Sequence, residues 1–288
     1  MTENNTPRAR GIYKEEKMKL WLMEATAFAH IASFFCFLKF FDRTKMYFTK
    51  GFVSYILIGV WFILTAACVI YSLRADKSIG FKRQNDAFFS GVTCVAFAIS
   101  GIIAGILNKD YIFLILALVS AVYFLPKQVR IPTTPRALCG IAAVVFLIYA
   151  IYVTYFDPNV PVNSPAKVIR LLGLATGALF IVYDIRAELG LISERAFNVV
   201  GSIALITLSF SMPTAIVLKD VKGSTPVTVL AYAALAYMLN FLLAKRKHED
   251  ETTIQTADTP ENQENPDAQE EYCEVGESQE DQSTDENS

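Results

Sequence analysis

The sequence predicts an all-α fold: a polytopic bundle of about eight transmembrane helices followed by a disordered acidic tail. Of the 288 residues, 53% are hydrophobic, and the mean hydropathy is +0.36. Residues 1–248 carry 26 Lys or Arg and 13 Asp or Glu, whereas Glu249–Ser288 carry 15 Asp or Glu and no Lys or Arg. An ordinary soluble domain does not combine such hydrophobicity with such a charge split, so we expect an integral membrane protein.

Seven apolar stretches approach the length of about 20 residues that a helix needs to cross a bilayer core of about 30 Å. They are Phe52–Leu73, Ala87–Leu107, Tyr111–Leu125, Pro135–Phe156, Pro165–Ala187, Phe197–Leu218 and Pro226–Ala244. Three of them start with a hydroxyl residue followed by proline, at Thr134-Pro135, Ser164-Pro165 and Thr225-Pro226. A hydroxyl can cap an orphan amide and proline fits the first helical position, so this pattern predicts three helix starts.

An eighth candidate span, Leu20–Phe41, contains Glu24 and His30, which lie about 240° apart around a helix and form no single cluster. The stretch either crosses the membrane or lies flat at its surface, which would leave seven spans. If it crosses with the N-terminus inside, the cytoplasmic segments hold 16 Lys or Arg and the outer segments hold eight. This bias favours a cell-membrane protein with both termini in the cytoplasm.

Three regions follow from this topology. Residues 1–19 form a basic cytoplasmic segment, residues 20–247 the transmembrane domain, and residues 248–288 the acidic tail, which has too few bulky apolar side chains to fold. The tail either solvates the protein or docks on a basic cytoplasmic partner protein, which the abrupt change after Lys245-Arg246-Lys247 favours. The other expected partner is the lipid bilayer. We expect no nucleic acid partner, and the oligomeric state stays open.

Charged residues inside the spans concentrate in Pro165–Ala187, which carries Arg170, Asp184 and Arg186. Charges in the hydrocarbon core are costly and are functional candidates by default. The two arginines could instead extend to the headgroups. Asp184 is too short to do so, and we expect either an ion pair with Arg195 or the 126–136 loop, or a place along a substrate path.

Pro213 lies within the predicted span Phe197–Leu218 and should kink it, because proline removes one helical hydrogen bond. Such breaks occur at transporter sites as well as in plain kinks, and Ser209 and Ser211 could take up freed backbone groups. The candidate ion or substrate path therefore comprises Arg170, Asp184, Arg186, Ser209, Ser211 and Pro213. Small residues one turn apart predict close helix packing at Gly101, Gly105, Gly173 and Gly177.

The sequence lacks the motifs of common enzymes: there is no His-Glu-x-x-His, no Gly-x-Ser-x-Gly and no Walker A loop. Tyr183-Asp184 resembles half of the signature of intramembrane aspartyl proteases, whose second half, a Gly-x-Gly-Asp in a later span, is missing. Two histidines and five scattered cysteines predict no metal site and no cofactor. We therefore expect no enzymatic activity.

Two hypotheses for the function remain. Because most spans are uniformly apolar, the leading one is a non-enzymatic sensory, scaffold or regulatory component that acts through its cytoplasmic loops and acidic tail. The alternative is a small secondary transporter or channel whose path passes Asp184, Arg170 and the Pro213 kink.

Overall fold

The computed structural model describes residues 7–75, 77–81, 87–107, 109–126 and 129–218. The chain divides into two units, residues 1–247 and 248–288. The predicted last span Pro226–Ala244, its Thr225 cap, the Lys245-Arg246-Lys247 cluster and the predicted tail lie outside the described residues.

The described part of the chain is helical apart from one small hairpin and the connecting loops. Its elements are α1 (Pro7–Phe40), β1 (Phe41–Asp42), β2 (Tyr47–Phe48), α2 (Phe52–Ser72), α3 (Ala87–Leu107), α4 (Tyr111–Tyr123), α5 (Thr133–Tyr155), α6 (Pro165–Glu188), α7 (Glu194–Ser211) and α8 (Thr214–Val217). Within the described residues, five helices are long and apolar enough to cross a membrane: Leu20–Phe40 within α1, α2, α3, α5 and α6. The predicted helical bundle of membrane type is confirmed at this level.

The outward faces of these helices carry large apolar side chains. Ile31 of α1, Phe62 of α2 and Ile106 of α3 are each at least 65% exposed. A soluble monomer rarely exposes so many large apolar side chains, and contact with lipid would remove them from water.

Several predicted helix boundaries are wrong. The predicted span Tyr111–Leu125 ends at Tyr123, because Arg136 of α5 donates from Nε to the Tyr123 carbonyl (3.3 Å) and from its guanidinium to the Leu125 carbonyl. The resulting 13-residue helix α4 is about 20 Å long, shorter than a bilayer core. α5 begins at Thr133 with Pro132 as its N-cap, so Thr134 is a helical residue and not the cap.

The boundaries of α1, α6 and α7 also differ in detail from the predicted ones. Ser164 is the N-cap of α6, as predicted, but its hydroxyl donates to the Met46 carbonyl (2.8 Å) and not to the helix. α1 starts at Pro7, before Leu20, and ends at Phe40, because Phe41 already belongs to the hairpin. α7 has Ser193 as its N-cap, whose hydroxyl accepts from the Ala196 amide (3.3 Å).

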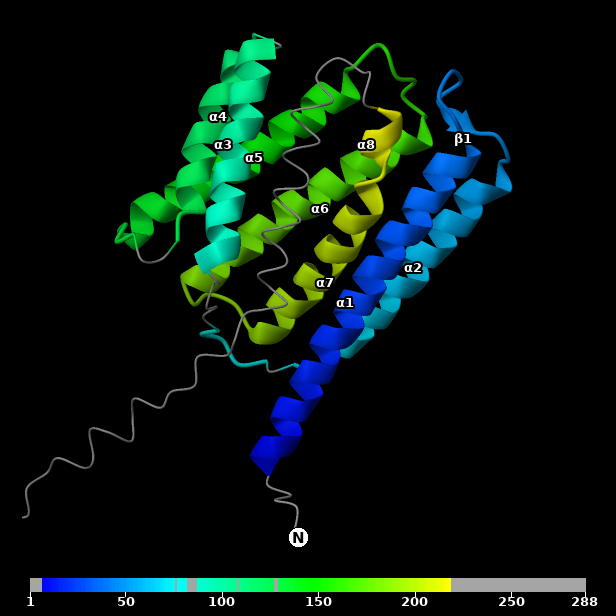
Figure 1. Cartoon of the computed structure of the whole chain (residues 1–288). Coiled ribbons are helices and arrows are strands. Elements are labelled where there is room, and N and C mark those ends of the chain that lie inside the picture. The colour runs from blue at the N-terminus through cyan, green and yellow to red at the C-terminus, as the bar shows by residue number, and fades with distance from the viewer. Residues whose placement is uncertain (1–6, 76, 82–86, 108, 127–128, 219–288) are drawn as a thin grey trace, which may run out of the picture. The chain divides into compact units, whose positions relative to one another are not determined.

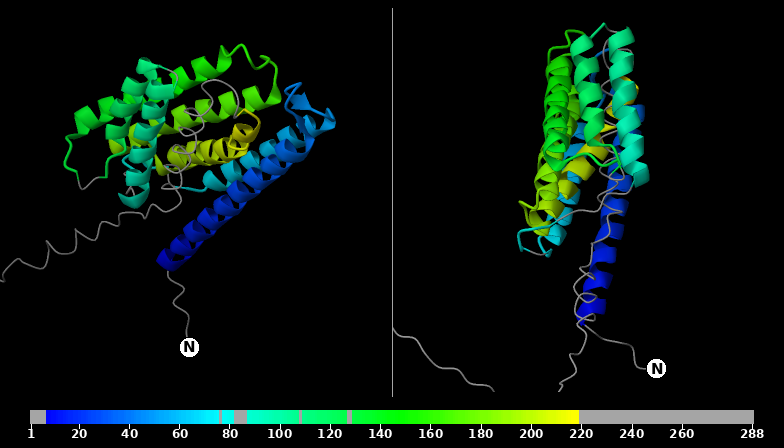
Figure 2. Two further views of the ribbon diagram at one scale, coloured as in Figure 1. Left: turned by 45° about the horizontal axis from the view of Figure 1, so that its top comes forward. Right: turned by 90° about the vertical axis from the view of Figure 1, so that its left-hand side faces the viewer.

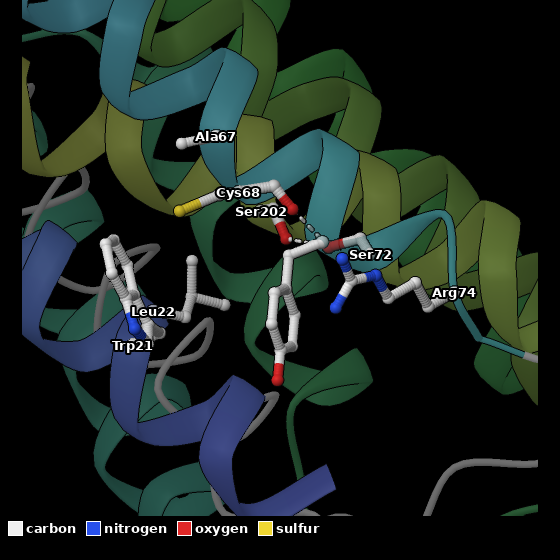
Figure 3. A pocket seen from close by; sticks show the side chains of 8 residues that line it. Trp21, Leu22, Ala67, Cys68, Ser72, Arg74 and Ser202 are labelled. Carbon is white, nitrogen blue, oxygen red and sulfur yellow. Dashed lines mark hydrogen bonds between the residues drawn. The ribbon is translucent and has the colours of Figure 1, made fainter. Parts of the chain in front are cut away.

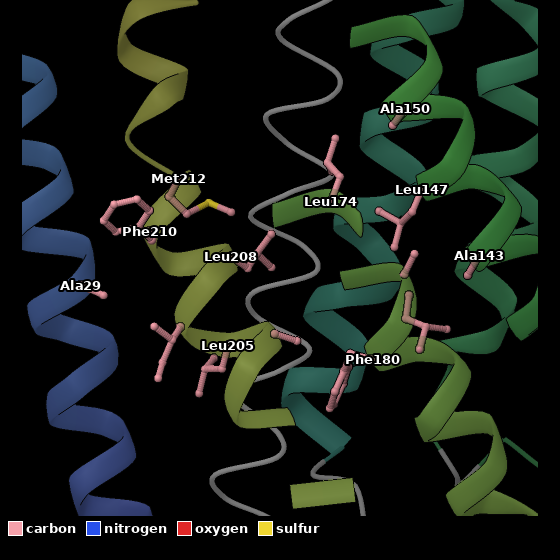
Figure 4. Close-up of a cluster of buried hydrophobic side chains, with 14 of the residues drawn as sticks. Ala29, Ala143, Leu147, Ala150, Leu174, Phe180, Leu205, Leu208, Phe210 and Met212 are labelled. Atoms are coloured by element: carbon pink, nitrogen blue, oxygen red, sulfur yellow. The ribbon is translucent and has the colours of Figure 1, made fainter. Parts of the chain in front are cut away.

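Helix α7 joins two groups of helices (Figure 1). α3, α4, α5, α6 and α7 each pack against the next, while α1 and α2 pack against each other and against α7 (Figure 2). Figure 4 shows Phe210 of α7 pointing toward α1 and Leu208 pointing toward α6. α7 therefore has protein on several sides, with α1, α2 and α6 packed against it.

Loops meet at both ends of this arrangement. At one end, the β1–β2 hairpin packs Phe41 against Phe48 and is tied to α6 through Met46 and Ser164. At the other end, Ile79 forms an antiparallel bridge with Ser193. The loops before α2 and α6 thus lie at one end, and the loops before α3 and α7 lie at the other.

Candidate functional site

Polar residues gather on helix α7, which is buried along most of its length. Phe197 to Thr214 are buried except Ile203 and Val199. The buried polar residues of this segment and α8 are Asn198, Ser202, Thr207, Ser209, Ser211 and Thr214. A helix that is both buried and rich in hydroxyl groups suits polar contacts inside the protein better than contact with lipid.

The predicted span Phe197–Leu218 is not one continuous helix. α7 stops at Ser211, Met212 and Pro213 form a turn, and α8 covers only Thr214–Val217. Because Pro213 has no N–H, the carbonyl of Ser209 loses the donor that would come from four residues on. We call the segment from Ser209 to Thr214 the α7 break.

Side chains replace the backbone donors at the α7 break. His30 of α1 lies with Nδ1 3.2 Å from the Ser209 carbonyl oxygen, so this nitrogen carries the proton that the bond requires. Ser33, one turn further along α1, donates its hydroxyl to the Phe210 carbonyl (2.7 Å). Thr214 donates to the Ser211 carbonyl (2.6 Å). Three consecutive carbonyls thus accept hydrogen bonds from side chains. Two of these side chains belong to α1.

Two of the predicted candidate residues, Arg170 and Asp184, are buried on the same face of α6. Arg170, Gly173, Gly177 and Asp184 are all buried and fall within about 40° of one line along the helix. We call these four residues the α6 stripe. A Cβ atom at Gly173 would overlap the Ser211 hydroxyl and lie 2.6 Å from the Ser211 Cβ, so glycine is needed for α6 to approach the α7 break.

The other predicted glycines lie at a different contact. A Cβ at Gly101 would overlap the Ala117 Cβ, and one at Gly105 would lie 3.0 Å from Leu114 Cδ2. Both glycines therefore let α3 approach α4 closely.

The predicted charged residues fall into different environments. Arg170 is 4% exposed and Asp184 is 0% exposed, whereas Arg186 is exposed, with its guanidinium carbon 5.8 Å from the Tyr183 ring centroid. The Arg186 side chain is therefore free to extend toward lipid headgroups. The same expectation is wrong for Arg170, whose side chain is covered by protein. Arg170 lies one turn from Gly173, on the side away from Asp184.

Asp184 lies near the opposite end of α6, about 16 Å along the helix from Gly173. Its Oδ2 accepts a hydrogen bond from the Tyr123 hydroxyl of α4 (2.8 Å). The expected partner Arg195 is elsewhere, donating from Nε to the Ala75 carbonyl (3.1 Å). The structure thus brings Ser209, Ser211 and Pro213 together with Gly173, and keeps Asp184 in a separate contact with Tyr123.

Two cations counted with the loops are buried anchors. Arg136 is 7% exposed and holds the end of α4. Lys167 is 1% exposed and donates from Nζ to the carbonyls of Asp157 and Val160, both at 3.0 Å. Neither charge is available to lipid headgroups.

Two buried hydroxyl groups in the described part of the chain have no hydrogen-bond partner: Ser209 Oγ on α7 and Thr65 Oγ1 on α2. An unpaired buried hydroxyl costs about 1–3 kcal/mol, so Ser209 marks a point where a bound polar group would be stabilised. No set of three His, Cys, Asp or Glu residues that could hold a metal occurs within the described ranges.

Sequence patterns did not reveal the residues that complete these contacts. Pro213 signals that the Ser209 carbonyl needs a new donor, but the identity of that donor as His30 depends on which helix lies beside α7. Tyr123 and Ser33 carry no sequence signal, because a lone hydroxyl in an apolar helix usually bonds to its own backbone.

In comparisons with known proteins, no protein-family model, curated protein or solved structure matches this chain.

Proposed function

We propose that this chain is a cell-membrane protein with eight spans and both termini in the cytoplasm. The alternation of loops between the two ends, with Ser164 contacting Met46 and Ser193 bridging Ile79, supports up-and-down threading. The excess of Lys and Arg supports the orientation. Leaving out Arg136 and Lys167, which are buried, removes one cation from each side and keeps the bias.

We further propose that it works as a small secondary transporter or channel, with the α7 break as its binding site for a small polar solute. The observation that carries this proposal is the unpaired Ser209 hydroxyl, buried at 1% exposure beside a helix break in the bundle. Broken helices inside membrane proteins persist where the freed backbone lies in protein or lines a cavity. No catalytic step is part of this proposal.

The environment of the site supports a solute over an unoccupied kink. The carbonyls of Ser209 and Phe210 accept hydrogen bonds from His30 and Ser33. These bonds stabilise the conformation of the α7 break. Gly173 brings α6 against it, with the buried Arg170 one turn away. The unpaired Ser209 hydroxyl offers a hydrogen-bond donor to a solute with an acceptor atom.

The test is solute flux into proteoliposomes that contain the full chain, using sodium, chloride, inorganic phosphate and a panel of amino acids as probes. We expect at least one probe to be taken up above protein-free liposomes. We place the buried Asp184 on the same path, about 16 Å along α6 from Gly173, so Asp184→Asn should abolish that uptake. The variant should still insert and purify normally, because it loses the negative charge but keeps an oxygen that can accept from Tyr123.

A matched variant separates charge from structure. Tyr123→Phe keeps the Asp184 carboxylate and removes the hydrogen bond that Tyr123 donates to it, so it should lower stability and retain flux. If most Asp184→Asn protein fails to assemble but the assembled fraction shows normal flux, Asp184 is a structural residue. Absence of uptake for every probe would contradict the transport proposal.

A second candidate function, a sensory, scaffold or regulatory component, is favoured by the charge of residues 249–288. Cross-linking in native membranes, comparing the full chain with a chain ending at His248, tests it. A protein captured only when the tail is present would support this function. Identical captures from both chains would remove its main support.

A further inference from the structure

A cavity of about 250 Å³ lies between α1, α2 and α7, away from the α7 break. Its walls are mainly apolar: Trp21 and Leu22 come from α1, and Ala67 and Cys68 come from α2 (Figure 3). Tryptophan is typical of the membrane interface, where its ring meets both hydrocarbon and water. The cavity therefore offers a hydrocarbon-like lining at one end of the helices.

The polar lining of the cavity includes two serine hydroxyls and one cation. Ser72 and Ser202 share a hydrogen bond of 2.8 Å, which ties α2 to α7. Arg74 lies two residues beyond the end of α2 and is exposed, with its guanidinium carbon 5.1 Å from the Tyr71 ring centroid. Figure 3 shows this guanidinium at the edge of the lined space. An exposed cation thus stands next to an apolar cavity at the end of a candidate membrane span.

We propose that this cavity binds one anionic phospholipid, with an acyl chain against Trp21, Leu22 and Ala67 and with its phosphate on Arg74. The apolar and the cationic parts of the lining together indicate this ligand. A free anion would leave the apolar walls uncovered, and an uncharged lipid would leave Arg74 without an anionic partner. An arginine binds a phosphate through several N–H groups. This site is distinct from the solute site at the α7 break and does not depend on it.

Native mass spectrometry of the full chain, purified with added phosphatidylglycerol or diacylglycerol, tests the proposal. We expect one phosphatidylglycerol to be retained in preference to diacylglycerol, which has the acyl chains but no phosphate for Arg74. Arg74→Gln should weaken retention about fivefold, which corresponds to about 1 kcal/mol for one interfacial cation. The control Arg43→Gln removes an exposed cation from the hairpin and should leave retention unchanged.

A second variant tests the cavity itself. Ala67→Trp fills the space from α2 without altering Arg74, and it should prevent lipid retention while the protein still purifies. Equal loss in Arg74→Gln and Arg43→Gln, or full retention in Ala67→Trp, would overturn the proposal. Displacement of the lipid by 10-fold excess inorganic phosphate would also overturn it, because a phosphate ion alone should not replace the contacts of an acyl chain.

Discussion

Pro213 affects one backbone atom directly: the carbonyl oxygen of Ser209 loses its helical donor, because proline has no N–H. The carbonyl accepts from His30 on a different helix, and the hydroxyl of the same serine is left unpaired. Gly173 then brings α6 into contact with Ser211. The site therefore depends on a few residues whose roles are local and can be tested singly.

Gly173→Ala should destabilise the protein by about 1–3 kcal/mol, because the added methyl group overlaps Ser211 in packed surroundings. Gly59→Ala in α2 is the control, since nothing lies within 4 Å of its added methyl group. Thermal unfolding of both variants in the same detergent checks this prediction. Equal melting temperatures for the two variants would show that the Gly173 contact can relax freely.

Lys167→Met should also be destabilising, by about 1–3 kcal/mol, because it leaves the buried carbonyl of Val160 without its donor. Lys77→Met, which changes an exposed lysine, should have little effect. Denaturant midpoints of the two variants provide the measurement. A similar midpoint for both would mean that Lys167 is replaceable by water.

At the scale of elements, α1 and α7 are coupled through the break. α1 supplies His30 and Ser33 at the positions where the ladder of α7 is interrupted. The hydrogen bond from His30 substitutes for the amide that Pro213 lacks. The two residues should therefore not contribute independently to stability.

A double-mutant cycle tests this coupling. His30→Ala alone should cost about 1–3 kcal/mol, because the Ser209 carbonyl loses its donor. In the Pro213→Ala background the same change should cost less, because replacing the proline restores a backbone amide at that position. Unfolding free energies of the four proteins give the coupling energy, expected at about 0.5–3 kcal/mol. Additive effects would mean that His30 does not stand in for the missing amide.

How far the sequence predicts these elements differs between them. Periodic apolar stretches located the helices, because burial in lipid or protein demands apolar side chains over whole turns. They misplaced the ends of α4 and α5, because Arg136 and Pro132 act through contacts that no local pattern contains. The break at Pro213 was predictable from proline chemistry, whereas His30 as its partner requires the packing of α1 on α7.

At the scale of the molecule, the loops sort into two sets. The hairpin that contains Thr44 and the loop that contains Asn159 lie toward the end marked by the contact between Met46 and Ser164. Ser78 and Leu191 lie toward the end marked by the bridge between Ile79 and Ser193. If the bundle crosses a membrane, these ends face opposite compartments.

Single cysteines in a cysteine-free chain test that topology. A membrane-impermeant maleimide added to intact cells should label Thr44→Cys and Asn159→Cys, and should label Ser78→Cys and Leu191→Cys only after the membrane is opened. The opposite pattern would reverse the orientation. Labelling of all four from one side would contradict a bundle that crosses the membrane.

The most direct test of the binding site is the thermal stability of Ser209→Ala with and without the transported probe. Without the probe, we predict that the variant is as stable as the wild type or more stable, because it lacks an unpaired buried hydroxyl. A probe at 100 times its Kd should stabilise the wild type by about 2.7 kcal/mol and the variant much less. Thr154→Val, a change on α5, should keep the wild-type response. A full response in Ser209→Ala, or a loss of stability without the probe, would contradict a solute site at the α7 break.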